Sequence, residues 1–155
     1  MKKLTNKKMT IKNLILTFLF SAISISLSGQ EKHLKTVNEA QELSDKVVSL
    51  FYQNKITEAF DALIPYWPMP ENELMAIEEK TIKYLNIIEQ RFGESIGNVK
   101  VKNETISDIA IRETYLIRYN SSAIRLIFTY YKNDNGWIVN AFKWDDSFSE
   151  EFKED

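Results

Sequence analysis

The spacing of apolar residues changes halfway along the chain, from a helical period to a period of two. Three segments carry apolar residues three and four positions apart, which is typical of amphipathic helices: 36–52, 56–64 and 71–92. Three prolines between 65 and 70 separate the second segment from the third. Proline removes a backbone donor and disfavours helical geometry in the preceding residue, so this stretch predicts a rigid connector. Gly93 and Gly97 are expected to end the third helix.

The second half alternates apolar and polar residues and is rich in β-branched and aromatic side chains, which predicts strands. Four are expected, at 98–106, 110–120, 123–132 and 137–144. Short polar turns at 120–122 and 133–136 join the last three, so neighbouring strands should be antiparallel. The predicted fold is α+β, with three N-terminal helices packed on a curved four-stranded antiparallel meander.

Turn lengths predict which residues face one another across the strands. A two-residue turn at Ser121–Ser122 creates one apolar face from three cross-strand pairs: Tyr119–Ile124, Ile117–Leu126 and Tyr115–Phe128. A three-residue loop in the first hairpin extends that face with two further pairs: Val99–Ile117 and Val101–Tyr115. We expect this face to pack against the helices and to line any pocket.

The first 29 residues have the features of a secretory signal peptide. Five lysines precede an apolar run from Leu14 to about Ile25, small residues follow up to Gly29, and no acidic residue occurs before Glu31. The run is shorter than the roughly 20 residues of a membrane span, although an uncleaved N-terminal anchor is the alternative. The expected organisation is a signal peptide at 1–29, the α+β domain at 30–146 and an acidic tail at 147–155. We expect a secreted or periplasmic protein with no stable membrane span after processing.

Composition limits the chemistry of the chain. It has 20 Lys+Arg and 22 Asp+Glu, and removing the five lysines of the leader leaves 15 bases against 22 acids, a net charge of −7. Such a domain has no general attraction for nucleic acid. Without cysteine, and with His33 as its one histidine, the chain predicts no disulfide, no thiolate nucleophile and no histidine or cysteine metal site. We expect no cofactor and no metal.

Glu113 is the one carboxylate on the predicted apolar face, opposite Tyr130 and beside Tyr115. It is either a pocket base or, because unpaired carboxylates are seldom buried, a group near a strand end that reaches water. Aromatic residues between the prolines are candidates for a pocket rim or for a lid on the core. The candidate ligand-binding residues are Tyr66, Trp67, Glu113, Tyr115, Phe128 and Tyr130.

The opposite face of the predicted sheet is basic. The same register places Arg118 directly opposite Arg125, a repulsive pair, and Arg112 shares their face. Lys100 and Lys102 would join them. These residues form a candidate surface for an anion or an acidic partner, and the alternative is a solvated face balanced by Glu104 and the acidic tail.

Several stretches carry a resemblance to a known fold family. They are 54–60, 115–119, Phe128–Lys132, Gly136–Trp137 and Phe142–Asp146. A helix-rich first half followed by this meander resembles the NTF2-like (cystatin-like) α+β cone, in particular small exported bacterial proteins of that fold. The family includes enzymes, ligand-binding domains and adaptors, so the resemblance implies a fold more than an activity. The histidine used by some dehydratases of the family has no counterpart here, since His33 lies outside the expected domain.

Three functions are compatible with these features. The leading hypothesis is an exported, non-catalytic binding or accessory domain with an apolar pocket or a protein-interaction face, for a small apolar ligand or a protein partner. The second is a small isomerase- or hydratase-type enzyme with Glu113 as base and Tyr115 or Tyr130 as hydrogen-bond donor. The third is a homodimer through the outer sheet face, where Leu116 and Ile127 are apolar.

We predict that the exported protein lacks about the first 29 residues, because the lysine-rich start and the short apolar run are recognised and removed during export. Intact-mass measurement on protein from the cell envelope checks this. A chain that still begins at Met1 in that fraction would contradict the prediction.

Overall fold

Helices form the first half of the domain, as predicted. The structure is a computed structural model that describes residues 32–152, so the predicted signal peptide and the last three residues lie outside the described part. The helices are α2 (Val37–Tyr52), α3 (Ile56–Leu63) and α4 (Glu71–Phe92), with a 3-10 turn, η1 (Ile64–Tyr66), after α3. The hydroxyl of Thr36 caps α2 by accepting a hydrogen bond from the Glu39 N–H at 3.1 Å. Glu71 and Glu73 place negative charge in the first turn of α4, where it favours the helix dipole.

Gly93 ends α4 in a conformation that favours glycine. Its φ is +83°, and a Cβ atom there would lie 2.9 Å from the side-chain nitrogen of Asn120, in the turn between two strands. Gly97, which we also expected to end the helix, lies instead inside the first strand. The chain therefore leaves the helix at Gly93 and has already entered β1 at Gly97.

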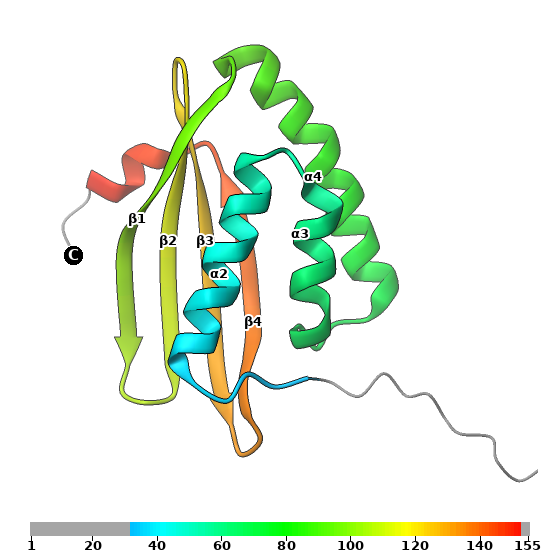
Figure 1. Cartoon of the computed structure of the whole chain (residues 1–155), viewed down its shortest axis with the longest axis vertical. Coiled ribbons are helices and arrows are strands. Elements are labelled where there is room, and N and C mark those ends of the chain that lie inside the picture. The colour runs from blue at the N-terminus through cyan, green and yellow to red at the C-terminus, as the bar shows by residue number, and fades with distance from the viewer. Residues whose placement is uncertain (1–31, 153–155) are drawn as a thin grey trace, which may run out of the picture. The chain divides into compact units, whose positions relative to one another are not determined.

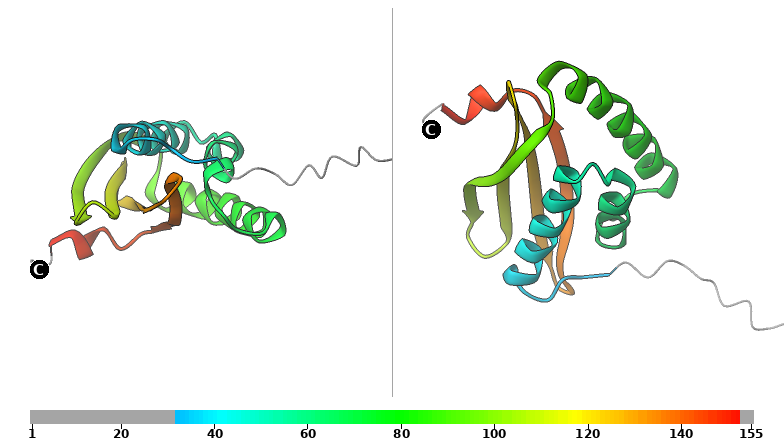
Figure 2. Two further views of the ribbon diagram at one scale, coloured as in Figure 1. Left: turned by 90° about the horizontal axis from the view of Figure 1, so that it is seen from below. Right: turned by 45° about the horizontal axis from the view of Figure 1, so that its top comes forward.

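The four strands form one antiparallel meander in the order β1-β2-β3-β4. They are β1 (Ser95–Ile106), β2 (Ala110–Tyr119), β3 (Ala123–Asn133) and β4 (Gly136–Asp145), followed by the 3-10 turn η2 (Phe148–Phe152). Helices α2 and α3 cover one face of the curved sheet, η2 lies on the other side, and α4 runs beside β4 (Figures 1 and 2). The predicted α+β fold, three helices on a four-stranded antiparallel meander, is confirmed.

The turn between β2 and β3 is one residue earlier than we predicted. The Tyr119 N–H donates to the Ser122 carbonyl at 2.8 Å, so Asn120 and Ser121 form the two-residue loop. The pairing therefore shifts by two residues: Ile117 faces Ile124, and Tyr115 faces Leu126 rather than Phe128. The predicted pairs are wrong, but the predicted buried face is right, because a shift of two preserves the alternation of sides.

A β-bulge at Val101 changes which side of β1 faces the helices. The predicted pairs of Val99 and Val101 are wrong: Lys100 faces Tyr115, and Asn98 faces Ile117. One extra residue in one strand reverses the side of every residue beyond it. Val99 and Val101 are consequently exposed, and Lys100 points toward the helices.

Another bulge, at Asn140, lies in β4. Thr129 pairs with Ala141 and Tyr130 pairs with Val139, which leaves Asn140 without a partner position. The bulge keeps Phe142 and Trp144 on the same side as Val139. Phe142 then completes an aromatic core with Phe51, Phe60 and Phe128.

None of the helices described for residues 32–152 is long and apolar enough to cross a membrane.

Phe128→Ala is expected to lower the free energy of unfolding by about 3–5 kcal/mol, because Phe128 is fully buried between the rings of Tyr115 and Phe142. Equilibrium urea unfolding measures the loss. Tyr131→Ala, on the same strand but exposed, is the control and should change stability by less than about 0.5 kcal/mol. Equal losses in the two variants would mean that the buried face is misassigned.

Candidate functional site

Glu113 lies on the helix-facing side of β2 and is completely buried, with 0% of its side chain exposed. Its partner is Lys100, whose Nζ donates to Glu113 Oε1 at 2.7 Å and lies 5.0 Å from the centroid of the Tyr115 ring. The side chain of Lys100 is 31% exposed, so its ammonium group lies where the ion pair meets solvent. The bulge at Val101 brings the two residues together, because without it Lys100 would point to the opposite face.

Two tyrosine hydroxyl groups connect this part of the sheet to α2. Tyr115 donates to Asp45 Oδ1 at 2.7 Å, and Tyr130 and Ser44 share a buried hydrogen bond of 2.7 Å. Burial raises the pKa of both tyrosines, and the nearby Glu113 carboxylate raises each pKa further. Both phenols therefore keep their protons and are already engaged with α2.

Glu113 does not reach water, which contradicts one of our two interpretations of this residue. Its second oxygen, Oε2, has no hydrogen-bond partner among the described residues. A buried carboxylate with a single cationic partner depends on that partner, because removing the cation leaves an uncompensated charge. The Lys100–Glu113 pair is consequently a structural ion pair with one unused acceptor.

Aromatic side chains occupy the space in which we expected a pocket. Phe128 is fully buried, and Trp67 is buried with its ring edge-to-face on Phe142, 6.3 Å between centroids. Tyr66 is partly buried against the same core. The structure thus brings Glu113, Tyr115, Phe128 and Tyr130 together under α2, and places Trp67 over the adjoining aromatic core.

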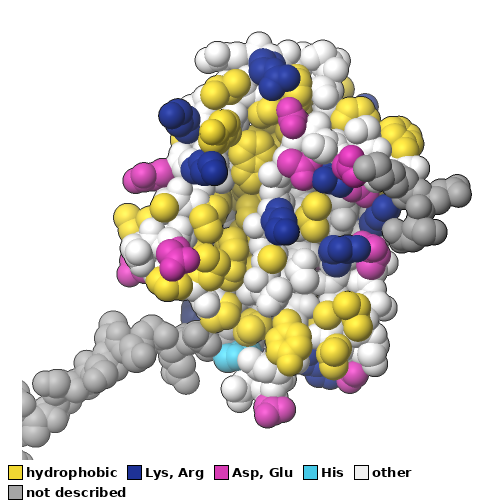
Figure 3. Space-filling view, turned by 180° about the vertical axis from the view of Figure 1, so that it is seen from behind, with side chains coloured by type: hydrophobic (Ala, Val, Ile, Leu, Met, Phe, Trp, Pro, Cys, Tyr) yellow, Lys and Arg dark blue, Asp and Glu magenta, His cyan; other side chains and the backbone are white. Residues whose placement is uncertain are grey.

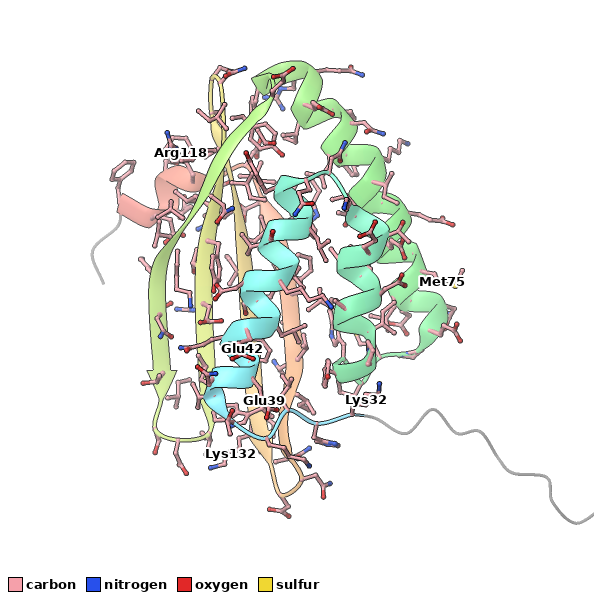
Figure 4. All side chains as sticks on the ribbon, viewed as in Figure 1. Lys32, Glu39, Glu42, Met75, Arg118 and Lys132 are labelled. Atoms are coloured by element: carbon pink, nitrogen blue, oxygen red, sulfur yellow. The ribbon has the colours of Figure 1, made fainter. Side chains whose placement is uncertain are left out.

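Two of the three arginines of the outer face, Arg112 and Arg125, are paired with carboxylates. Arg118 faces Ala123, and Arg125 faces Leu116, so the predicted Arg118–Arg125 contact is wrong because of the two-residue shift in register. Arg112 forms two hydrogen bonds to Glu104, at 2.8 and 2.7 Å. Arg118 is exposed near the upper end of the sheet in Figure 4.

Arg125 holds the C-terminal turn on the sheet. Two of its nitrogens donate to Asp145 at 2.9 and 2.8 Å, and a third donates to Glu151 of η2 at 2.7 Å. Lys102 adds a salt bridge to Glu151 at 3.5 Å. Burial alone would raise the pKa of Asp145, but hydrogen bonds from Arg125 and from the Ser147 N–H lower it below its ordinary value. Part of the acidic tail is therefore tied to the basic face, where Leu116 and Ile127 are half-buried.

A groove lies between α4 and β4, where sequence reasoning did not place a site. It encloses about 750 Å³ and is open to solvent. Hydrophobic side chains gather over this region in the view from behind (Figure 3). Its apolar lining consists of Ile77, Tyr84, Ile87, Ile88, Phe142 and Trp144.

Polar contacts join the two walls of the groove. The indole N–H of Trp144 donates to the hydroxyl of the buried Thr81 at 3.1 Å, and Arg91 pairs with Asp146 at 3.7 Å. The sequence signal for this groove is a second apolar stripe on α4, at Tyr84 and Ile87, beside the stripe that enters the core. A helix with apolar residues on two adjoining faces must cover more than one surface.

Histidine, aspartate and glutamate form no group that could hold a metal ion within residues 32–152.

Lys100→Met is expected to lower the free energy of unfolding by about 3 kcal/mol at neutral pH, because it leaves the Glu113 charge buried without a partner. The double variant Lys100→Met/Glu113→Gln should recover most of this loss, since it removes both charges. Chemical unfolding of Lys100→Met, Glu113→Gln and the double variant gives the coupling free energy between the two side chains. Additive losses would show that the two groups do not interact.

Comparison with known proteins yields few matches. No family model matches the chain, and no curated protein matches it. Among solved structures, it is similar to a protein from Campylobacter jejuni described as a "Putative NTF2-like transpeptidase". The two are 14% identical, the match covers 64% of this chain and 95% of that chain, and the TM-score is 0.44.

Proposed function

We propose that the protein is an exported binding or accessory domain of the NTF2-like kind, and that its ligand occupies the groove between α4 and β4. The observation that carries the proposal is the groove itself. About 750 Å³ is within the usual range of roughly 300–1,000 Å³ for small-molecule sites, and the lining is mostly apolar with a few polar groups. Exposed apolar side chains gathered in one hollow are typical of a binding surface.

The walls of the groove are held in place independently of any ligand. Leu74, Leu85 and Ile88 anchor α4 in the core, and the Thr81–Trp144 hydrogen bond joins the helix to β4. Tyr84 and Ile87 remain exposed on the face of α4 that lines the groove. Such a preformed hollow binds with a small ordering cost.

Export belongs to the same proposal. Its support is the lysine-rich start, the short apolar run and the small residues before Gln30, which together favour a cleaved signal peptide and a secreted or periplasmic location.

An isomerase- or hydratase-type activity is the second proposal, because Glu113 Oε2 is a buried acceptor with no partner within residues 32–152 and two tyrosines lie beside it. Glu113→Gln distinguishes the two proposals. It should abolish such an activity and leave binding in the groove unchanged, since Glu113 does not line the groove.

Ile87→Glu is expected to weaken binding of an uncharged fluorescent probe such as Nile red by at least about tenfold, because it places a carboxylate in the apolar lining. Ile82→Glu is the matched control: the two isoleucines are 42% and 37% exposed on the same helix, but Ile82 does not line the groove. Fluorescence titration of both variants, with circular dichroism to verify folding, is the measurement. Equal affinities in Ile87→Glu, Ile82→Glu and the unmodified protein would refute the proposed site.

A further inference from the structure

Along the groove, the acidic residues have basic partners, whereas two lysines form no salt bridge within residues 32–152. Both acidic residues of the lining are balanced by arginine, since Asp145 accepts two hydrogen bonds from Arg125 and Asp146 pairs with Arg91. Lys80 and Lys143 also line the groove, and neither forms a salt bridge with any residue between 32 and 152. The groove therefore has surplus positive charge, although the predicted mature protein is acidic overall.

The backbones of the two lysines lie near the same end of the groove. Lys80 precedes Thr81 and Lys143 precedes Trp144, and the side chains of Thr81 and Trp144 are hydrogen-bonded at 3.1 Å. Consecutive Cα atoms are about 3.8 Å apart, so the two lysine backbones lie close to this contact. The side chain of Lys143 leaves β4 on the face opposite to Trp144, because neighbouring residues of a strand alternate, and it borders the groove at the outer rim. The ammonium group of Lys80 lies 5.9 Å from the ring centroid of Tyr84, the next residue along the apolar lining.

The rest of the groove is suited to an alkyl chain. From Lys80, the lining continues through Tyr84, Ile87 and Ile88 to Arg91, which is closed off by its pair with Asp146. At about 1.5 Å per helical residue this stretch of α4 spans roughly 16 Å. The groove thus has a basic end and an apolar length.

Building on the proposed function of the groove, we propose that its ligand is a long-chain carboxylate, with the alkyl chain along α4 and the carboxylate at the end of the groove that Lys80 and Lys143 border. Charge complementarity favours this occupant over an uncharged or cationic amphiphile. The surplus ammonium groups attract an anion, and the apolar lining favours an anion that carries a hydrocarbon chain.

Titration with dodecanoate, 1-dodecanol and dodecyltrimethylammonium, each below its aggregation concentration, tests the proposal. Tryptophan fluorescence, to which Trp144 in the groove contributes, and the melting temperature report binding. We expect dodecanoate to bind about tenfold more tightly than dodecanol, which corresponds to two partly screened charge pairs, and this preference should shrink as salt is added. Dodecyltrimethylammonium should bind most weakly.

The double variant Lys80→Gln/Lys143→Gln should lose the preference for dodecanoate while still binding dodecanol. Lys83→Gln is the control, because Lys83 lies on the same helix but not on the groove, and it should keep the preference. If dodecanoate and dodecanol bind the unmodified protein equally well, or if the lysine variant keeps the preference, the assignment of a carboxylate is overturned and the binding groove stands. If none of the three probes binds, the proposed function fails and this inference fails with it.

Discussion

The Lys100–Glu113 ion pair is the constraint around which the sheet is arranged. A fully buried carboxylate is tolerated only with a compensating charge, and the nearest source is the strand beside it. A regular β1 would present Val101 to Tyr115 and keep Lys100 outside. The bulge at Val101 supplies the cation at the cost of exposing Val99 and Val101. The need to compensate one buried charge thus determines which side chains of β1 face the helices.

The same interior leaves little room for a ligand under α2. Tyr115 and Tyr130 use their hydroxyl groups to bind Asp45 and Ser44 of α2, which connects the helix to the sheet through paired polar groups. The rings of Phe128, Phe142 and Trp67 occupy the adjoining space. Because this side is filled, the apolar groove that is open to solvent lies on α4 instead.

Helix α4 lies beside β4, the last strand of the sheet (Figure 1). An exposed edge strand offers unpaired backbone groups to other chains. At the start of β4, Leu34 forms two backbone hydrogen bonds with Trp137, of 2.9 and 2.8 Å. Farther along β4, Trp144 binds Thr81 of α4. The groove is lined by this contact and by the Arg91–Asp146 pair, so the two contacts that join α4 to the end of the sheet also border the proposed binding site.

The sequence by itself determined the elements of this protein, and the tertiary structure decided their alignment. Helical spacing, three prolines and Gly93 predicted the helices, and period-two alternation predicted the strands and the buried face, because these signals are local. Alternation cannot distinguish pairings that differ by two residues, so the Tyr115–Phe128 pair was predicted wrongly although both side chains are buried. The local sequence pattern could not predict the bulges at Val101 and Asn140 either. The first depends on a partner residue in the neighbouring strand, and the second depends on packing against the helices. The same holds for the candidate site: Glu113 was identifiable as the one carboxylate on an apolar face, but its lysine partner and the groove beside β4 exist only once distant segments pack together.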